Sequence, residues 1–288
     1  MVWLMAISPK CVISILCVAL VSLLCGAQTK VDAVKKRYSE IPFNPSVDRI
    51  PGNYIGNDAD IIYRVLERRE NSQAKGEFET TEQYQARIER LNRQPLTGSL
   101  QITSLLAFKV ADVKFRYVAD DRVMKLYLPT SFAVDEADQI DNSRIALKVQ
   151  ESVSFRSYAA SNAFGATTLV KEKDVKSIQL GVVNAPDFEL RNDPDPDLDC
   201  FYGPDLQCFY GELRLAPEQA RRLKQSARAL VIGSLADRPI SKGASTGDAT
   251  IQNPTAYFEQ VRYVNLEVSE IWIYSPETGT VFLKIRPK

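Results

Sequence analysis

The spacing of apolar residues changes at Pro95, and this change constrains the fold more than any other feature of the sequence. Before Pro95, apolar residues recur every three or four positions, as they do in helices. After Pro95, they alternate with polar residues, as they do in strands that expose one face to water. The sequence therefore predicts an α+β fold: an N-terminal helical hairpin, then a mainly antiparallel β region in one or two packed sheets, with one further short helix.

The helical part contains two predicted helices separated by a turn at Lys75-Gly76. The first runs from Asp58 to about Arg69, and Asn57 is placed to cap it. The second runs from about Thr81 to Arg93, because Thr80 and Gln83 have the spacing of a capping box. Its predicted buried stripe is Tyr84, Ile88 and Leu91, and Glu89 can pair with Arg93 one turn later.

The β part begins with a predicted hairpin, 113–118 and 123–128, around Asp120-Asp121. The further helix begins at Pro217, since proline suits the first helical turn. Residues 241–248 are small and predict a loop. The other predicted strands are 145–149, 152–158, 167–171, 177–183, 209–215, 229–235, 261–274 and 280–285.

The N-terminal segment predicts export. Lys10 is followed by an uncharged run, Cys11 to Cys25, of the length of a signal-peptide core. Small residues at Gly26-Ala27 favour a signal peptide spanning 1–27, with Gln28 as the mature N-terminus. Two alternatives stay open: lipid modification at Cys25, which Leu24 disfavours, and an uncleaved membrane anchor. We expect a periplasmic or cell-envelope protein, with no stable membrane span in the mature chain.

Cleavage there would leave Cys200 and Cys208, an even number in a chain sent to an oxidising compartment. We expect a disulfide between them. A zinc site is the alternative, but the chain has no histidine, so carboxylates would have to supply half of a tetrahedral ligand set.

The mature chain divides by composition. Residues 28–56 are polar and interrupted by proline, which predicts an irregular leader. Residues 57–184 carry the helical hairpin and a β region, 185–199 form an acidic, proline-rich loop, and 200–288 are β-rich. One continuous domain or two lobes both fit the length.

The acidic loop and the segment after it offer two candidate sites. Four carboxylates at alternate positions could gather Ca²⁺ or belong to a solvated, stiff connector; they are Asp193, Asp195, Asp197 and Asp199. The tetrapeptide Cys-Phe-Tyr-Gly at 200–203 is repeated at 208–211. Its aromatic residues either form an exposed surface for a ligand or partner or pack in the core. The candidate surface residues in this segment are Tyr202, Phe209 and Tyr210.

The segment 76–87 contains Phe78-Glu79-Thr80, Tyr84 and Arg87 in the pattern FET-x3-Y-x2-R. It resembles a helix-entry segment of uncharacterised exported bacterial proteins. The resemblance implies an exported envelope protein and no known activity. The residues themselves suggest that Phe78 and Tyr84 anchor the helix and that Arg87 can contact a partner.

The composition excludes several chemistries. Without histidine there is no Ser-His-Asp or Cys-His nucleophile system. No glycine-rich phosphate-binding motif occurs, and 36 basic against 36 acidic residues give no charge footprint for nucleic acid. We therefore expect a non-catalytic binding or assembly protein with an envelope protein as its partner and no cofactor. The alternatives are a Ca²⁺- or small-ligand-binding module and a carboxylate hydrolase of envelope glycans.

Overall fold

A computed structural model describes residues 39–288 except 53, 111, 138, 162–164, 166, 193–207 and 251, and it leaves the side chains of 142 and 143 undescribed. All of these residues belong to one compact unit, 38–288. The helices are α2 (Ala59–Asn71), α3 (Thr81–Arg93) and α4 (Pro217–Ser226), with a 3-10 turn η1 (Ala185–Asp187). The strands are β1 (Leu106–Val110), β2 (Lys114–Val118), β3 (Val123–Leu128), β4 (Ser131–Val134), β5 (Ile140–Ser161), β6 (Thr167–Val182), β7 (Leu190–Arg191), β8 (Cys208–Arg214), β9 (Arg228–Gly247), β10 (Thr255–Tyr274) and β11 (Val281–Ile285).

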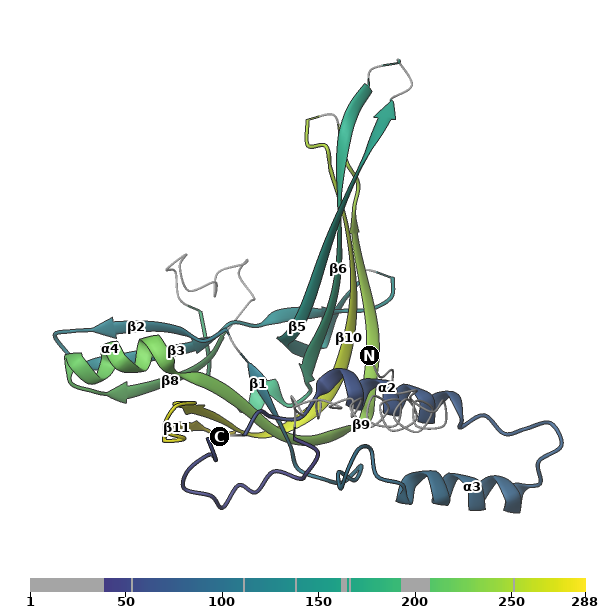
Figure 1. Cartoon of the computed structure of the whole chain (residues 1–288), viewed down its shortest axis with the longest axis horizontal. Coiled ribbons are helices and arrows are strands. Elements are labelled where there is room, and N and C mark those ends of the chain that lie inside the picture. Colours follow the sequence, from purple (N-terminus) through teal and green to yellow (C-terminus); the bar gives the residue numbers. More distant parts are fainter. Residues whose placement is uncertain are drawn as a thin grey trace, which may run out of the picture. The chain divides into compact units, whose positions relative to one another are not determined.

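The described strands form two sheets, and the predicted α+β class is confirmed (Figure 1). The large sheet has the order β1-β9-β10-β6-β5-β4, and β11 adds to β10 beyond the end of β6. All of its pairings are antiparallel except that between β6 and β10. The small sheet has the order β2-β3-β8-β7. Each sheet therefore takes strands from both sides of the acidic segment.

Helix α2 covers the inner face of the large sheet, the face that points to the main core. Its N-cap is Asp58 rather than the predicted Asn57, because the Asp58 carboxylate accepts hydrogen bonds from the backbone N–H groups of Asp60 and Ile61. Asn57 instead accepts from Ala107 N–H at 2.7 Å and so ties the helix entry to β1. The main core contains α2 residues such as Ile62 together with apolar residues of both sheets and of α4.

Helix α3 has the predicted bounds and the predicted Thr80–Gln83 capping box. The Glu89–Arg93 pair is also present, at 3.3 Å. The predicted buried stripe is wrong: α3 has no buried residue, and Tyr84, Ile88 and Leu91 are half-buried. The helical pattern was correct, but pattern alone does not say how closely a neighbour packs.

The segment before α2 covers part of the outer face. No residue of the described range 39–56 lies in a helix or strand, as the leader prediction implied. Phe43 and Ile50 are nevertheless buried against β1, β9 and β10. The ring of Phe43 meets the ring of Trp272 edge-on at 5.2 Å. An irregular segment thus contributes to a second buried cluster, on the outer face of the large sheet.

The long strands are the main departure from the predicted elements. Strand β5 runs without a break through two predicted strands, and so does β6. Strand β9 continues through 241–247, where small residues predicted a loop. Small residues are accepted there because other parts of the chain approach the strand closely, as described below.

Candidate functional site

The feature that distinguishes this fold is the arm, defined here as residues 151–161 of β5, 167–176 of β6, 243–247 of β9 and 255–260 of β10. Figure 1 shows these strand segments running together away from the helices and the small sheet. The arm continues the sheet order β9-β10-β6-β5, with β10 paired to β6 in parallel from Thr255 to Leu266. It therefore extends the large sheet beyond the main core.

The arm exposes apolar side chains that the rest of the sheet would bury. Phe155 is 72% exposed, Leu169 60% and Val153 41%. Because side chains alternate along a strand and cross-strand partners share a face, these three lie on one face of the sheet. Tyr158 is 44% exposed on the opposite face. An exposed group of large apolar side chains on a soluble protein typically marks an interaction surface.

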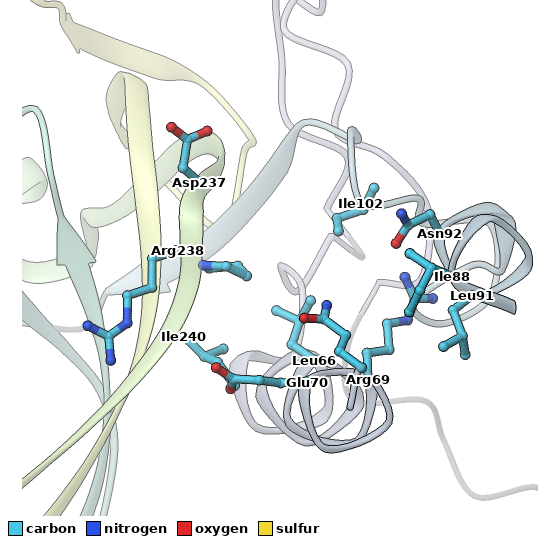
Figure 2. Close-up of a pocket in the computed structure, with 12 residues that line it drawn as sticks. Leu66, Arg69, Glu70, Ile88, Leu91, Asn92, Ile102, Asp237, Arg238 and Ile240 are labelled. Carbon is cyan, nitrogen blue, oxygen red and sulfur yellow. The ribbon is translucent and has the colours of Figure 1, made fainter. Parts of the chain in front are cut away.

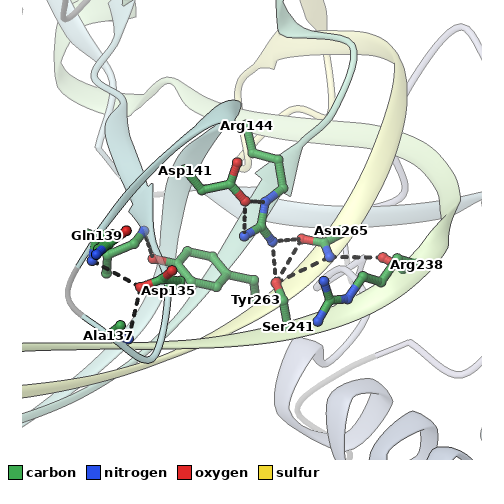
Figure 3. Close-up of polar contacts among 10 residues, drawn as sticks. Asp135, Ala137, Gln139, Asp141, Arg144, Arg238, Ser241, Tyr263 and Asn265 are labelled. Atoms are coloured by element: carbon green, nitrogen blue, oxygen red, sulfur yellow. Dashed lines mark hydrogen bonds and ion pairs between the residues drawn. The ribbon is translucent and has the colours of Figure 1, made fainter.

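A buried polar cluster fixes the base of the arm (Figure 3). Arg144, at the start of β5, has only 10% of its side chain exposed. It binds the Asp141 carboxylate at 2.6 Å and donates to the Asn265 side-chain oxygen at 2.9 Å and to the Ser241 hydroxyl. Its guanidinium also lies over the Tyr263 ring, 5.1 Å from the centroid. One cation therefore joins β5 to β9 and β10.

Asn265 lies at a register shift between β9 and β10. Val264 pairs with Ile240 and Leu266 with Leu235, so residues 236–239 of β9 lie opposite Asn265 alone. The Asn265 amide donates to the backbone oxygen of Arg238 at 2.8 Å and so binds a carbonyl of this bulge. Bulges bend and twist a strand, and this one lies where β9 leaves the core for the arm.

The turn after β4 closes over the same region. The Tyr263 hydroxyl accepts a hydrogen bond from Val134 N–H at 3.0 Å, and the backbone oxygen of Asp135 accepts from Ala244 N–H at 3.0 Å. Gly243 is required because a Cβ there would collide with the carbonyl oxygen of Val134. The small residues of β9 thus allow close backbone approach.

A second candidate is the groove between α2, α3 and β9, of about 220 Å³ (Figure 2). Leu66, Ile88 and Ile240 are among its apolar walls. Arg69 lines it and is only 8% exposed, and burial lowers the pKa of its guanidinium. It donates to the backbone oxygens of Gln94 at 2.6 Å and Pro95 at 3.0 Å.

These carbonyls lie at the C-terminus of α3, where the helix dipole favours a cation. This explains how an arginine is buried with no carboxylate bound to it in the described part of the chain. Because α3 buries no side chain of its own, the Arg69 bonds are a main link between the two helices. We therefore assign the groove a structural role in attaching α3.

The segment 76–87 is organised by contacts within the chain. Arg87 binds the Glu79 carboxylate through two bonds of 2.8 Å and donates to the backbone oxygens of Ser72 and Ala74. The hydrogen bonds from Arg87 to the carboxylate lower the pKa of Glu79 to about 2. A partner of Arg87 would have to compete with them, and such a role stays a prediction. Phe78 does not anchor the helix, since it is 92% exposed.

The other predicted site residues are partly described. Phe209 and Tyr210 are buried, so they do not form an exposed aromatic surface. Their strand β8 lies between β3 and β7, and its consecutive side chains point to opposite faces. Phe209 joins the main core, and Tyr210 belongs to a small buried cluster with Tyr127 and Cys208. Tyr210 packs on Tyr127 at 5.4 Å and lies beneath Arg191. The core alternative is correct for these two residues.

Several predictions fall on residues that the structure does not describe, namely the signal peptide 1–27, the aspartates at 193–199, Cys200 and Tyr202. They stay predictions, as does the disulfide to Cys208, which is itself buried. Among the described residues, no three Cys, Asp or Glu side chains form a group suited to a metal ion. None of the helices described is both long and apolar enough to cross a membrane.

Comparisons with protein-family models, with curated proteins and with solved structures find no match to this chain.

Sequence reasoning missed the arm because it divided the strands. The signal was present: no glycine or proline separates 145–149 from 152–158, so one long strand was the simpler interpretation. The parallel partnership of β6 with β10 had no local signal, since it joins segments about 85 residues apart.

Proposed function

We propose that this protein is a non-catalytic binding or assembly module of the cell envelope, and that the arm is its interaction surface. The observation that carries the proposal is the exposure of Phe155, Leu169 and Val153 on one face of a sheet extension. Burying one such side chain in an interface contributes about 1.5–3 kcal/mol, so even a small patch supplies useful affinity. The placement in the envelope rests on the predicted export signal at 1–27.

The construction of the arm supports this role. Loops that carry binding residues are usually positioned by a rigid scaffold, and here long strands fixed by Arg144 and Asn265 serve that purpose. A structural role for the arm within the chain would place its apolar residues against other elements. Phe155 and Leu169 instead stay open to solvent in the described structure.

The test compares two variants of a tagged full-length protein after crosslinking in intact cells and mass spectrometry. Phe155→Ser/Leu169→Ser removes the exposed apolar side chains of the arm, and Phe78→Ser makes the same change at an exposed phenylalanine outside it. We expect the crosslinked partners to fall at least tenfold with the arm variant and to be unchanged with Phe78→Ser. Equal recovery with both variants would overturn the arm as the interaction surface.

A further inference from the structure

The outer edge of β5 is an open strand edge. From Glu151 to Ser161, β5 pairs with β6 on one side, and no described strand pairs with its other side. The opposite edge of the arm is different, because the Asp135 backbone accepts a hydrogen bond from Ala244 of β9 and Val134 lies against Gly243. One edge is therefore partly covered by the chain itself, and the other is left open.

The open edge lacks the usual protection against pairing. Natural edge strands are commonly guarded by charged side chains, prolines or bulges that oppose pairing with another strand. Between 151 and 161 there is no proline, and the charged residues are Glu151 and Arg156. Glu151 binds Lys148 at 2.8 Å, and Arg156 binds Glu172 at 2.6 Å. Because both charges are neutralised within the chain, neither repels an incoming strand.

We propose that the occupant of this edge is a second copy of the chain, which pairs its own β5 antiparallel to the first about a two-fold axis at Ser154. This inference rests on the proposed function, since it names the partner of the arm. A two-fold axis perpendicular to the sheet keeps each face on the same side in both copies, so residues opposite each other must come from the same face. That condition limits the register to a few choices.

The side chains select among these registers. With Ser154 opposite its own copy, Val153 of each chain lies opposite Phe155 of the other, which gives two aromatic–β-branched pairs. Shifting the axis to Val153 places Glu151 opposite Phe155, and shifting it to Phe155 places Val153 opposite Ser157. Shifting it to Arg156 places Phe155 opposite Ser157 and Val153 opposite Ala159, so neither apolar residue meets the other. Among these registers, only the one centred on Ser154 pairs Val153 with Phe155, the two exposed apolar residues that share this face of the arm on β5.

Cysteine crosslinking in the full-length protein tests this register. Opposite Cα atoms in an antiparallel pair are about 4.5 or 5.5 Å apart, within the range that a disulfide spans. Ser154→Cys should therefore form a disulfide-linked dimer on mild oxidation. In the same register, residue 152 lies about 13 Å from its own copy and residue 157 about 20 Å, at roughly 3.3 Å per residue. Ser152→Cys and Ser157→Cys are therefore the matched controls, and the unchanged protein measures the background from native cysteines.

We expect the dimer band to be at least tenfold stronger for Ser154→Cys than for either control, and the uncrosslinked protein to sediment as a dimer that Phe155→Ser converts to a monomer. Equal crosslinking at all three positions would overturn the register. A monomer in sedimentation, with no Ser154→Cys dimer, would overturn self-pairing. If the protein is a monomer and Phe155→Ser/Leu169→Ser still removes its crosslinked cellular partners, the arm remains an interaction surface for another protein. If that variant removes no partner, the proposed function fails as well.

Discussion

Replacing Arg144 with methionine tests whether the polar cluster at the base of the arm stabilises the fold. Arg144→Met keeps an unbranched aliphatic stem of similar length but removes the guanidinium that joins Asp141, Ser241 and Asn265. Removing one member of a buried ion pair costs about 3–5 kcal/mol, because the remaining charge loses that counter-ion. Asp141 keeps 29% of its side chain exposed and regains water, which lowers this cost toward the bottom of the range. The expected loss in the free energy of unfolding is therefore about 3 kcal/mol.

Urea denaturation of Arg144→Met and of a control variant measures this loss. When only stability changes, the midpoint of the unfolding transition shifts while the slope of the free energy against urea concentration stays constant. The matched control is Arg93→Met, which breaks the pair with Glu89 on the surface of α3, where the two side chains are 82% and 68% exposed. Such a pair contributes about 0.3–0.5 kcal/mol. A loss for Arg144→Met below about 1 kcal/mol would refute the argument that this cluster supports the arm.

Two further predictions concern Gly243 and Glu79. Gly243→Ala should destabilise by about 2–3 kcal/mol in thermal or urea unfolding, because its Cβ meets backbone that cannot move cheaply, whereas Gly247→Ala, whose Cβ would make an ordinary 3.7 Å contact, should change stability by less than about 0.5 kcal/mol. An equal effect of the two changes would contradict the close approach of Val134 to β9. Because Arg87 lowers the pKa of Glu79 from 4.5 to about 2, the stabilising bond is complete above pH 4.5 and is lost as the pH falls through about 2. A carboxyl titration by NMR should therefore show a Glu79 midpoint near 2 that moves toward 4.5 in Arg87→Met, and a midpoint near 4.5 in the unchanged protein would contradict the bond.

Helices α3 and α4 show how much local sequence determines. The Thr80–Gln83 capping box and the proline at position 217 specify where these helices begin. Capping side chains bond the free N–H groups of the first turn, and a proline there lacks an N–H that would have no helical partner, so both signals are local. The hairpin of β2 and β3 was also predictable, since its strands are joined by a short turn. Local chemistry therefore determined the α+β class and most element types, with the predicted loop at 241–248 as an exception.

The arm and its surface were decided only by the tertiary structure. The alternation in β5 predicts one dry face, yet the face that carries Phe155 stays exposed because β5 extends beyond the elements that cover its base. Asn265 also depends on long-range pairing, because the carbonyl that it binds belongs to a bulge in β9 about 25 residues earlier in the chain. Sequence alone specified the period of most elements, and export of the chain stays a prediction from its N-terminal segment. Which faces became core, which edge stayed open and which polar residues fixed the base of the arm depended on long-range pairing, which a local pattern does not encode.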